Sequence, residues 1–555
     1  MLYNTLNFLF ILVEVLLLFN LLILVHEIGH FLAAKWRGLY IDGFGIWFGK
    51  PIWQKKINGV TYSLGSIPAG GFVKLPQMAN PDAVEGETGT TPENLPPISA
   101  LDKIIVAFAG PLFSLGLAFV FAVIVWQVGR PVGESEGTRT VGYVMPDSPA
   151  EKAGFQAGDE ILTIDGHKVD HWGGMGSGSI TWLIVRSEGK TVPIEIMRGD
   201  KDLTLYPEPK IPEKAHWWNR KALRQIGLMA AGTPVSDKPE PNSPAEKAGL
   251  KPGDRIEQID GEKLNSPIGI YDYMKRHPAD SYTLTIQRGT ETIPLNFTPR
   301  GTKVVSLSDD PNSPAVQAKL QVGDIISGID GVKLVGSLAV TDYIQTHGEK
   351  PLTLSIVRDG KPLDVKVSPQ IPENAPDGDA KPRIGIVLDD DDGFVLDGMG
   401  ILTPTYPGPV EQIRASMKMI LNTVDAIVSP KSSIGIQHMG GPVMMMRAYY
   451  VMFENKEGWR LALWFSVVLN VNLALLNMLP IPVLDGGHIA LAIIEAVRRK
   501  PVNLKVLEAV QTACAVVIIG FMFFIFFFDV QDLPWFPASK APQMKFRSPT
   551  PETQK

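Results

Sequence analysis

Four stretches of this chain are long and apolar enough to cross a lipid bilayer, and they constrain its fold more than any other feature. They lie at about residues 5–34, 104–128, 460–482 and 507–528. A spanning helix needs about 20 mostly apolar residues, because every backbone hydrogen bond must close within the segment. We therefore expect a multi-domain integral membrane protein with a four-span α-helical membrane core.

The region between the second and third stretches, about residues 130–455, has the opposite character. It is polar and rich in Gly and Pro, which predicts a soluble insert between two membrane halves, residues 1–130 and 459–530. The net charge of the chain is −6, so composition gives no sign of a nucleic-acid partner. Cys514 is the only cysteine, which excludes an intrachain disulfide and a cysteine-rich zinc site.

Basic residues in the short loops predict the orientation of the spans. Such residues favour the cytoplasmic side, which places the N-terminus, the insert and the C-terminus on the other side. The N-terminal segment lacks the basic region and A-x-A-like site of a cleaved signal peptide, so we expect a retained anchor. The basic residues are Lys35, Arg37, Lys50, Lys55, Lys56 and Lys74 after the first stretch, and Arg498, Arg499, Lys500 and Lys505 after the third.

The insert contains one sequence three times. Each copy has a Ser-Pro pair, then the aspartate of an I-D-G triplet 17 positions after the serine, then two alternating apolar runs around a Gly-containing turn. Ser-Pro is typical of a helix start, and the paired runs predict a hairpin. The predicted units are residues 132–220, 221–301 and 302–386, with their serines and aspartates at Ser148 and Asp165, Ser243 and Asp260, and Ser313 and Asp330.

The repeated sequence, S-P-A-x-x-A-G-L-x-x-G-D-x-I-x-x-I-D-G, resembles the PDZ domain in its circularly permuted bacterial form. The resemblance implies small PDZ-like domains of α+β or β structure that bind extended peptides at a sheet edge. The third copy has Lys319 where the others have Gly154 and Gly249, which predicts an altered helix end. The alternative that the repeats are spacers or steric filters stays open.

Residues 387–458 are expected to be a link with amphipathic helices, and residues 531–555 a tail. The four aspartates at 389–392 lack the alternation and the terminal Glu of an EF-hand loop, so a solvated turn is expected there rather than a calcium site. Apolar residues recur at helical spacing in 409–428, which predicts a helix lying on the membrane surface or against the domains.

The first apolar stretch contains the sequence H-E-I-G-H at residues 26–30. In a helix, His26 and His30 share one face, and this spacing with Glu27 between them is a zinc-protease signature. Ionisable residues inside hydrocarbon are costly and by default mark a functional site. The motif therefore predicts a zinc hydrolase at membrane depth, with Glu27 as general base.

A catalytic zinc usually has three protein ligands, so a third must come from elsewhere. The best candidate is Asp485, which follows a stretch broken by Pro480 and Pro482. A broken helix is tolerated at membrane depth where it lines a cavity. Asn472 and Asn477 in the same stretch are polar residues that need partners.

These motifs together resemble the site-2 protease family of intramembrane metalloproteases, in its bacterial RseP type with PDZ domains between the second and third spans. The resemblance covers nearly the whole chain. It is carried by H-E-I-G-H, by F-A-G-P at 108–111, by N-M-L-P-I-P-V-L-D-G-G at 477–487, and by W-F-G-K at 47–50 and G-G-F-V-K at 70–74. The last two imply a membrane-associated β-hairpin region at 41–75.

The resemblance implies Zn²⁺ on His26, His30 and Asp485, with Glu27 activating the bound water. It places Asn472, Asn477 and Pro480 at substrate-handling positions, and an open strand edge at Gly70 and Gly71 to hold an extended substrate. The implied substrates are single-span membrane proteins, including trimmed anti-sigma factors. The implied location is the bacterial inner membrane, with the repeats on the periplasmic side and the active site near the cytoplasmic face.

Two other functions compete with this interpretation. A membrane-anchored PDZ scaffold with a non-catalytic zinc site would not need Glu27, which is present. A transporter with polar residues at the midplane fits poorly, since four spans without internal symmetry are not its usual pattern. His488 also lies near Asp485, but the family pattern favours Asp485 as the ligand.

Overall fold

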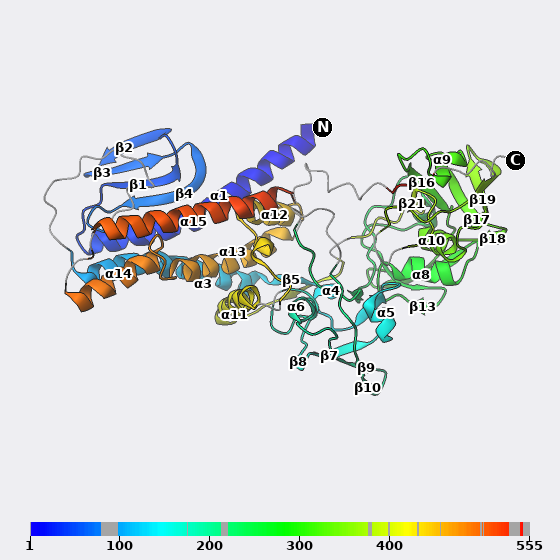
Figure 1. Cartoon of the computed structure of the whole chain (residues 1–555), viewed down its shortest axis with the longest axis horizontal. Coiled ribbons are helices and arrows are strands. Elements are labelled where there is room, and N and C mark those ends of the chain that lie inside the picture. The colour runs from blue at the N-terminus through cyan, green and yellow to red at the C-terminus, as the bar shows by residue number, and fades with distance from the viewer. Residues whose placement is uncertain are drawn as a thin grey trace.

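The computed structural model describes residues 2–78, 98–174, 176–211, 220–375, 380–397, 400–429, 432–455, 457–499, 502, 504–531 and 544–547. Four of the described helices are long and apolar enough to cross a membrane, near the four predicted stretches. They are α1 (Leu2–Trp36), α3 (Ala100–Val128), α13 (Gly458–Asn477) and α15 (Leu504–Gln531). Figure 1 shows them side by side at one end of the molecule, with the insert at the other.

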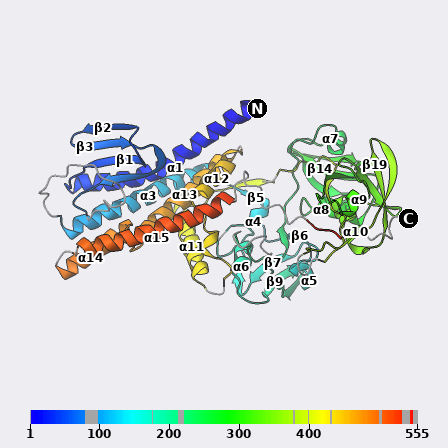
Figure 2. The ribbon, with the colours of Figure 1, turned by 45° about the horizontal axis from the view of Figure 1, so that its top comes forward.

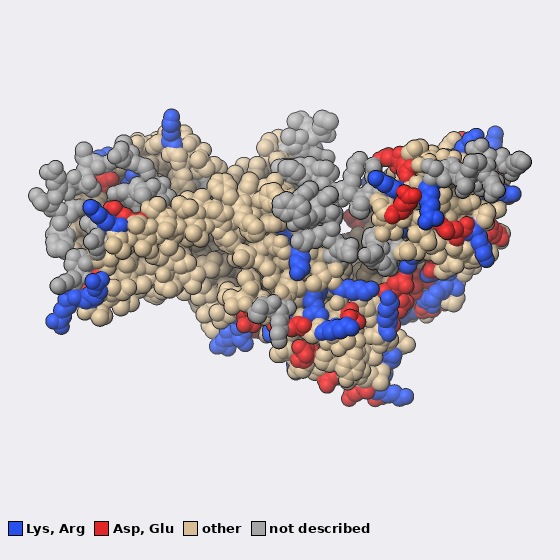
Figure 3. Space-filling view, viewed as in Figure 1, with Lys and Arg blue, Asp and Glu red and all other residues tan. Residues whose placement is uncertain are grey.

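Helices α1, α3 and α13 share one apolar core, in which Val15, Ala118, Ala122, Val467 and Val471 are almost fully buried. The small side chains of Ala118 and Ala122 let the neighbouring helices approach α3 closely. Over this helical end the visible surface is largely free of charged side chains, whereas Lys, Arg, Asp and Glu crowd the insert (Figure 3). This contrast is the one expected when one end faces lipid and the other faces water.

The region after α1 is a four-stranded sheet rather than the single β-hairpin expected at 41–75. Its strands are β1 (Gly43–Phe48), β2 (Trp53–Ile57), β3 (Val60–Leu64) and β4 (Ile67–Lys74), in the order β2-β3-β1-β4. Only β2 and β3 form a hairpin; β1 pairs parallel to β3 and antiparallel to β4. Trp47 Nε1 donates to Asn20 Oδ1 at 2.5 Å, which anchors the sheet to α1.

The third span ends at Asn477 and not at residue 482 as expected. Residues 478–484 are not helical, and a separate helix, α14 (Asp485–Arg498), follows. Pro480 and Pro482 lack the N–H that a continuous helix requires, so the chain breaks here. Helix α14 packs along α3, and Lys103 bonds Glu495 at 2.8 Å.

The insert leaves and rejoins the helical end through a two-stranded stalk. Strand β5 (Arg130–Gly133) directly follows α3 and pairs antiparallel with β22 (Leu402–Thr405), which leads back to the helices. Gly133 and Leu402 are opposite each other in this pair. Both ends of the insert therefore meet at one point (Figure 2).

The first repeat contains the predicted capped helix and hairpin. Ser148 caps α5 (Pro149–Ala153), and β9 (Ile194–Arg198) pairs with β10 (Lys201–Leu205). Its closing strand lies beyond the expected end at residue 220, because β11 (Leu228–Ala230) pairs with β6 (Val141–Val144). The remaining elements are β7 (Glu160–Ile164), β8 (His167–Lys168) and α6 (Ile180–Arg186).

The third repeat is inserted into the second, so the expected boundaries at 301 and 386 are wrong. In each repeat the N–H after Ser-Pro bonds to a closing segment: Ala150 to Ile226 O, Ala315 to Ile384 O, and Ala245 to Asp392 O. The second repeat thus receives its closing segment from beyond the whole third repeat. Phe394 and Leu396 pack in its core.

The elements of these two repeats follow the same plan. The second has α7 (Pro244–Ala248), β12 (Arg255–Ile259), β13 (Glu262–Lys263), α8 (Gly269–Arg276), β14 (Tyr282–Arg288) and β15 (Glu291–Phe297). The third has β16 (Thr302–Leu307), α9 (Pro314–Gln317), β17 (Ile325–Ile329), β18 (Val332–Lys333), α10 (Ser337–Thr346), β19 (Leu352–Arg358), β20 (Lys361–Val367) and β21 (Ile386–Asp390).

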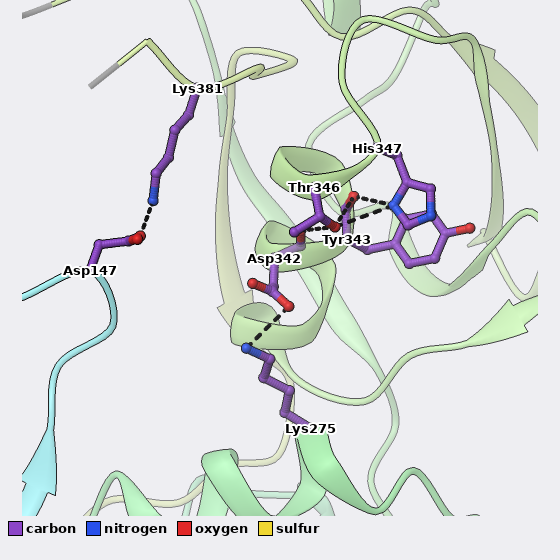
Figure 4. Close-up of polar contacts among 7 residues, drawn as sticks. All are labelled: Asp147, Lys275, Asp342, Tyr343, Thr346, His347 and Lys381. Carbon is purple, nitrogen blue, oxygen red and sulfur yellow. Dashed lines mark hydrogen bonds and ion pairs between the residues drawn. The ribbon is translucent and has the colours of Figure 1, made fainter. Parts of the chain in front are cut away.

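The acidic segment 387–400 is therefore not a solvated link. Its first part is strand β21, and its second part closes the second repeat, where the side chain of Asp392 is buried. Ionic contacts also join the repeats. Lys275 pairs with Asp342 at 3.2 Å, and Lys381 pairs with Asp147 of the first repeat (Figure 4).

Two further helices lie between the stalk and the third span. As expected, 409–428 is helical: α11 (Pro409–Val428) packs its Ala426 against Trp182 of the first repeat. Helix α12 (Pro442–Phe453) begins at a cap from the fourth span, since Asp529 accepts from the N–H groups of Gly441 and Met444. A short 3₁₀ turn, η1 (Ile436–His438), connects them.

Candidate metal centre

The two histidines of H-E-I-G-H lie one turn apart on the face of α1 that meets α3. Their Nε2 atoms are 3.3 Å apart, and His26 is buried. Gly110 of α3 makes this approach possible, because a Cβ there would lie 2.2 Å from His30 Nε2 and 2.9 Å from His26 Cε1. The G of F-A-G-P is thus required by close packing.

Asp485, the first residue of α14, faces both histidines. Its Oδ2 lies 3.2 Å from His26 Nε2 and its Oδ1 lies 3.3 Å from His30 Nε2. Among the described residues, these three are the group whose ligand atoms all lie within 4.8 Å of one another. Two ligand atoms about 2.1 Å from one tetrahedral zinc are about 3.4 Å apart. The observed separations match that geometry.

The other nitrogen of each imidazole is held by α3. His30 Nδ1 lies 2.8 Å from the carbonyl oxygen of Val106, which can only accept, so Nδ1 carries a proton; in the neutral imidazole the lone pair is then on Nε2. His26 Nδ1 lies 3.0 Å from Ser114 Oγ. Such outer contacts orient metal-binding histidines. Asp485 Oδ2 is buried and accepts no hydrogen bond of good geometry, although it lies 3.2 Å from His26 Nε2, which fits an oxygen that would bind a cation.

Glu27 is half-buried beside strand β4. A Cβ on Gly71 would lie 2.8 Å from Glu27 Cγ, so a glycine is needed where the strand passes the glutamate. Gly70 has φ +78, and its Cβ position is filled by the Phe48 ring. Strand β4 pairs with β1 and is an edge of its sheet. Among the described strands none pairs with the outer edge of β4, and this strand passes beside the carboxylate.

The other predicted site residues are placed differently. Asn477, the last residue of α13, has Nδ2 at 3.3 Å from His26 Nε2, so it joins the site. Pro480 is exposed in the non-helical link, and Asn472 is half-buried with no hydrogen bond to the three ligand candidates among the described residues. His488 lies outside the cluster.

Two residues that contact the histidines were not predicted as site residues from the sequence. Gly110 was noted only as part of the F-A-G-P motif, and Ser114 lies one helical turn after it, on the face of α3 toward His26. A helical projection of α3 would have placed both on one side, but only the packing of α1 against α3 shows that this side faces the histidines.

Fold and site together define a metallopeptidase whose reactive residues lie among membrane-type helices and which carries a repeated extramembrane insert. The model of Peptidase family M50 matches residues 14–521. The chain belongs to this family and is a metalloprotease.

Relatives resemble the chain along most of its length. A protein from Neisseria meningitidis that is named as a zinc metalloprotease is 28% identical, over 88% of this chain and 92% of its own. The Regulator of sigma E protease of Salmonella typhi is 24% identical, over 88% and 91%. The PDZ domain of an SdrC-like protein from Listeria monocytogenes is 26% identical, covering 18% of this chain and 97% of its own, with a TM-score of 0.15.

Proposed function

We propose that this protein is an intramembrane zinc endopeptidase that cleaves single-span membrane proteins in regulated proteolysis. The observation that carries the proposal is the convergence of His26 and His30 of α1 with Asp485 of α14, with Glu27 beside strand β4, which lies at the edge of its sheet. A scaffold with a dead site would not need a glutamate at that position.

Each residue of the site has a separate role in the proposed hydrolysis. His26, His30 and Asp485 would hold a zinc ion, which would lower the pKa of a bound water and polarise the scissile carbonyl. Glu27 is placed to act as general base and to return a proton to the leaving nitrogen. Asn477, beside His26, is placed to donate a hydrogen bond to the oxygen on which negative charge develops.

A transmembrane helix hides its carbonyls in its own hydrogen bonds, so it must unwind before cleavage. We propose that the unwound segment pairs with the free edge of β4, which would present its carbonyls to Glu27. Strand addition of this kind supplies main-chain hydrogen bonds without demanding one sequence. Trimmed anti-sigma factors would be one class of such substrates.

The test is cleavage of a single-span model substrate in proteoliposomes. Glu27→Gln keeps the shape of the side chain but cannot take the proton, so we expect activity to fall by about 10²-fold or more with zinc content unchanged. Glu14→Gln, at another glutamate of the same helix, serves as control and should cleave normally. Substantial cleavage by the Glu27→Gln enzyme would assign the base elsewhere.

We further propose that the repeats face the periplasm and the β1–β4 sheet the cytoplasm of a bacterial cell. The sheet and its flanks carry exposed Lys50, Lys55 and Lys56, in keeping with the preference of basic loops for the inner side. In a Cys514→Ser background, an impermeant maleimide added to spheroplasts should label Lys201→Cys, in the first repeat, but not Lys55→Cys. The reverse labelling would invert the topology.

A further inference from the structure

The tail after the fourth span returns to the insert and contacts the third repeat. Residues 544–547, Met-Lys-Phe-Arg, lie against this repeat, and Phe546 among them is 3% exposed. Glu373 N donates to Lys545 O at 2.8 Å, and Lys545 N donates to Asn374 Oδ1 at 2.8 Å. The tail segment therefore has both an apolar anchor and main-chain hydrogen bonds.

The site for Phe546 is a special feature of the third repeat. In each repeat a glycine follows the residue of the closing segment that binds the N–H after Ser-Pro. In the first and second repeats the carbonyl of this glycine accepts from a residue three positions before the serine of that pair: Met145 N donates to Gly227 O, and Glu240 N donates to Gly393 O. In the third repeat Gly385 O accepts instead from Ser308, five positions before Ser313. The loop is thus two residues longer at this point.

The longer loop provides the space and the polar contacts for the tail. A Cβ on Gly385 would lie 3.2 Å from the Phe546 ring, so the ring packs directly on the glycine. Asp310, within the loop, accepts from Phe546 N at 2.7 Å through Oδ2 and from Asn312 N at 2.9 Å through Oδ1. Arg547 N donates to Gln370 Oε1 at 3.2 Å.

Charge and connectivity agree with this contact. The tail segment carries Lys545 and Arg547, while the loops around it carry Asp309, Asp310 and Glu373. The insert follows the second span and the tail follows the fourth, so an even number of crossings separates them and both lie on one side. The 12 residues 532–543 between α15 and the tail segment can extend over about 40 Å.

We propose that the third repeat contains a binding site for a peptide with an aromatic residue between basic residues, and that its occupant is residues 544–547 of the same chain. The docked tail joins the fourth span directly to the third repeat; in the described part of the chain, the other connection of this repeat to the membrane end runs through the other repeats. The inference is independent of the catalytic proposal, because it concerns no residue of the metal centre.

The test uses the full chain in nanodiscs with a photo-crosslinking benzoylphenylalanine at position 546. We expect an intramolecular crosslink to peptides containing 308–313 or 383–385. Crosslinking only between two copies, or none to these segments, would overturn the assignment of the tail as the occupant.

A second measurement does not depend on the crosslinker. Phe546→Ala should raise amide exchange at Glu373 by about tenfold or more, because truncation of a buried Phe leaves the segment without its anchor. Lys201→Ala, an exposed substitution in strand β10 of the first repeat, should leave that exchange unchanged. Exchange in β19 and β20 should stay at the wild-type rate, which shows that the repeat itself remains folded. Equal protection of Glu373 in all three proteins would disprove docking.

Discussion

At the scale of single residues, one buried ion pair recurs in all three repeats and explains the Gly-Asp of the repeated sequence. Asp254 is buried and binds Arg288 through both oxygens at 2.7 Å, while Arg288 also donates to the carbonyl of Gly249. Burial raises the pKa of Asp254, but Arg288 and the N–H of Lys251 outweigh it and hold the pKa below its usual value. The corresponding pairs are Asp159 with Arg198 and Asp324 with Arg358.

Asp392 shows the opposite case, because it stands where the other repeats have Ile226 and Ile384. Burial raises the pKa of Asp392 to about 7; the N–H of Phe394 opposes the shift, while the nearby Asp390 and Asp389 add to it. The folded state then binds the proton more tightly than the unfolded state. The contribution of Asp392 to the free energy of unfolding is therefore fully present below about pH 4 and is lost as the pH rises to about 7.

We therefore predict that the closing segment of the second repeat loosens between pH 5 and pH 8. Amide protection factors of residues 393–397 should fall over this range in the wild type. Asp392→Asn, which cannot ionise, should give factors that do not change with pH. The difference between pH 5 and pH 8 should reach a few kcal/mol at most, given about 1.4 kcal/mol per pKa unit. A wild-type profile as flat as that of the variant would contradict the buried ionisation.

At the scale of elements, the end of helix α9 illustrates how a local change is absorbed. Gly154 and Gly249 adopt positive φ after α5 and α7, and Lys319 takes the same left-handed conformation at φ +58 after the shorter α9. A side chain is strained there, yet the carbonyl of Lys319 still accepts from Arg358. The altered helix end was predicted from the sequence. The left-handed turn at Lys319 is nevertheless kept, because Arg358 binds both the carbonyl of Lys319 and the carboxylate of Asp324.

Strand β4 is the element on which substrate handling can be tested directly. With benzoylphenylalanine at Phe72 of β4 in the Glu27→Gln protein, illumination should crosslink a single-span substrate, because this edge strand passes beside Glu27, the proposed general base. The same probe at Trp53, on the opposite edge strand β2, should not capture it. Equal capture at both positions would remove the β4 edge from substrate binding.

At the scale of the whole molecule, the stalk makes the insert a separable unit. Gly133 and Leu402 are paired across β5 and β22, so residues 134–401 can be replaced by a two-residue turn without moving either strand. The proposed role of the insert is to keep bulky ectodomains away from the site while trimmed stubs pass.

Replacing 134–401 should therefore leave cleavage of a trimmed substrate within about threefold of the wild type, since no group of the metal centre is removed. Cleavage of the untrimmed substrate in the same membranes should rise to a similar level. Rejection of the untrimmed protein as strong as that by the parent enzyme would show that the repeats serve another purpose, such as partner binding.

The sequence by itself determined the local features of this protein. Hydropathy located the four long apolar helices, the 17-residue spacing identified the repeats, and the helical spacing of His26 and His30 identified two of the three candidate ligands, because these signals depend on residues close together in the chain. Only the tertiary structure decided which distant segments meet. It made Gly110 and Ser114 parts of the site, turned an expected hairpin into a four-stranded sheet, and showed that Asp392 closes the second repeat from beyond the third. These outcomes depend on packing between elements up to hundreds of residues apart. Local signals in a single sequence, such as hydrophobic periodicity or a helix cap, do not report such contacts.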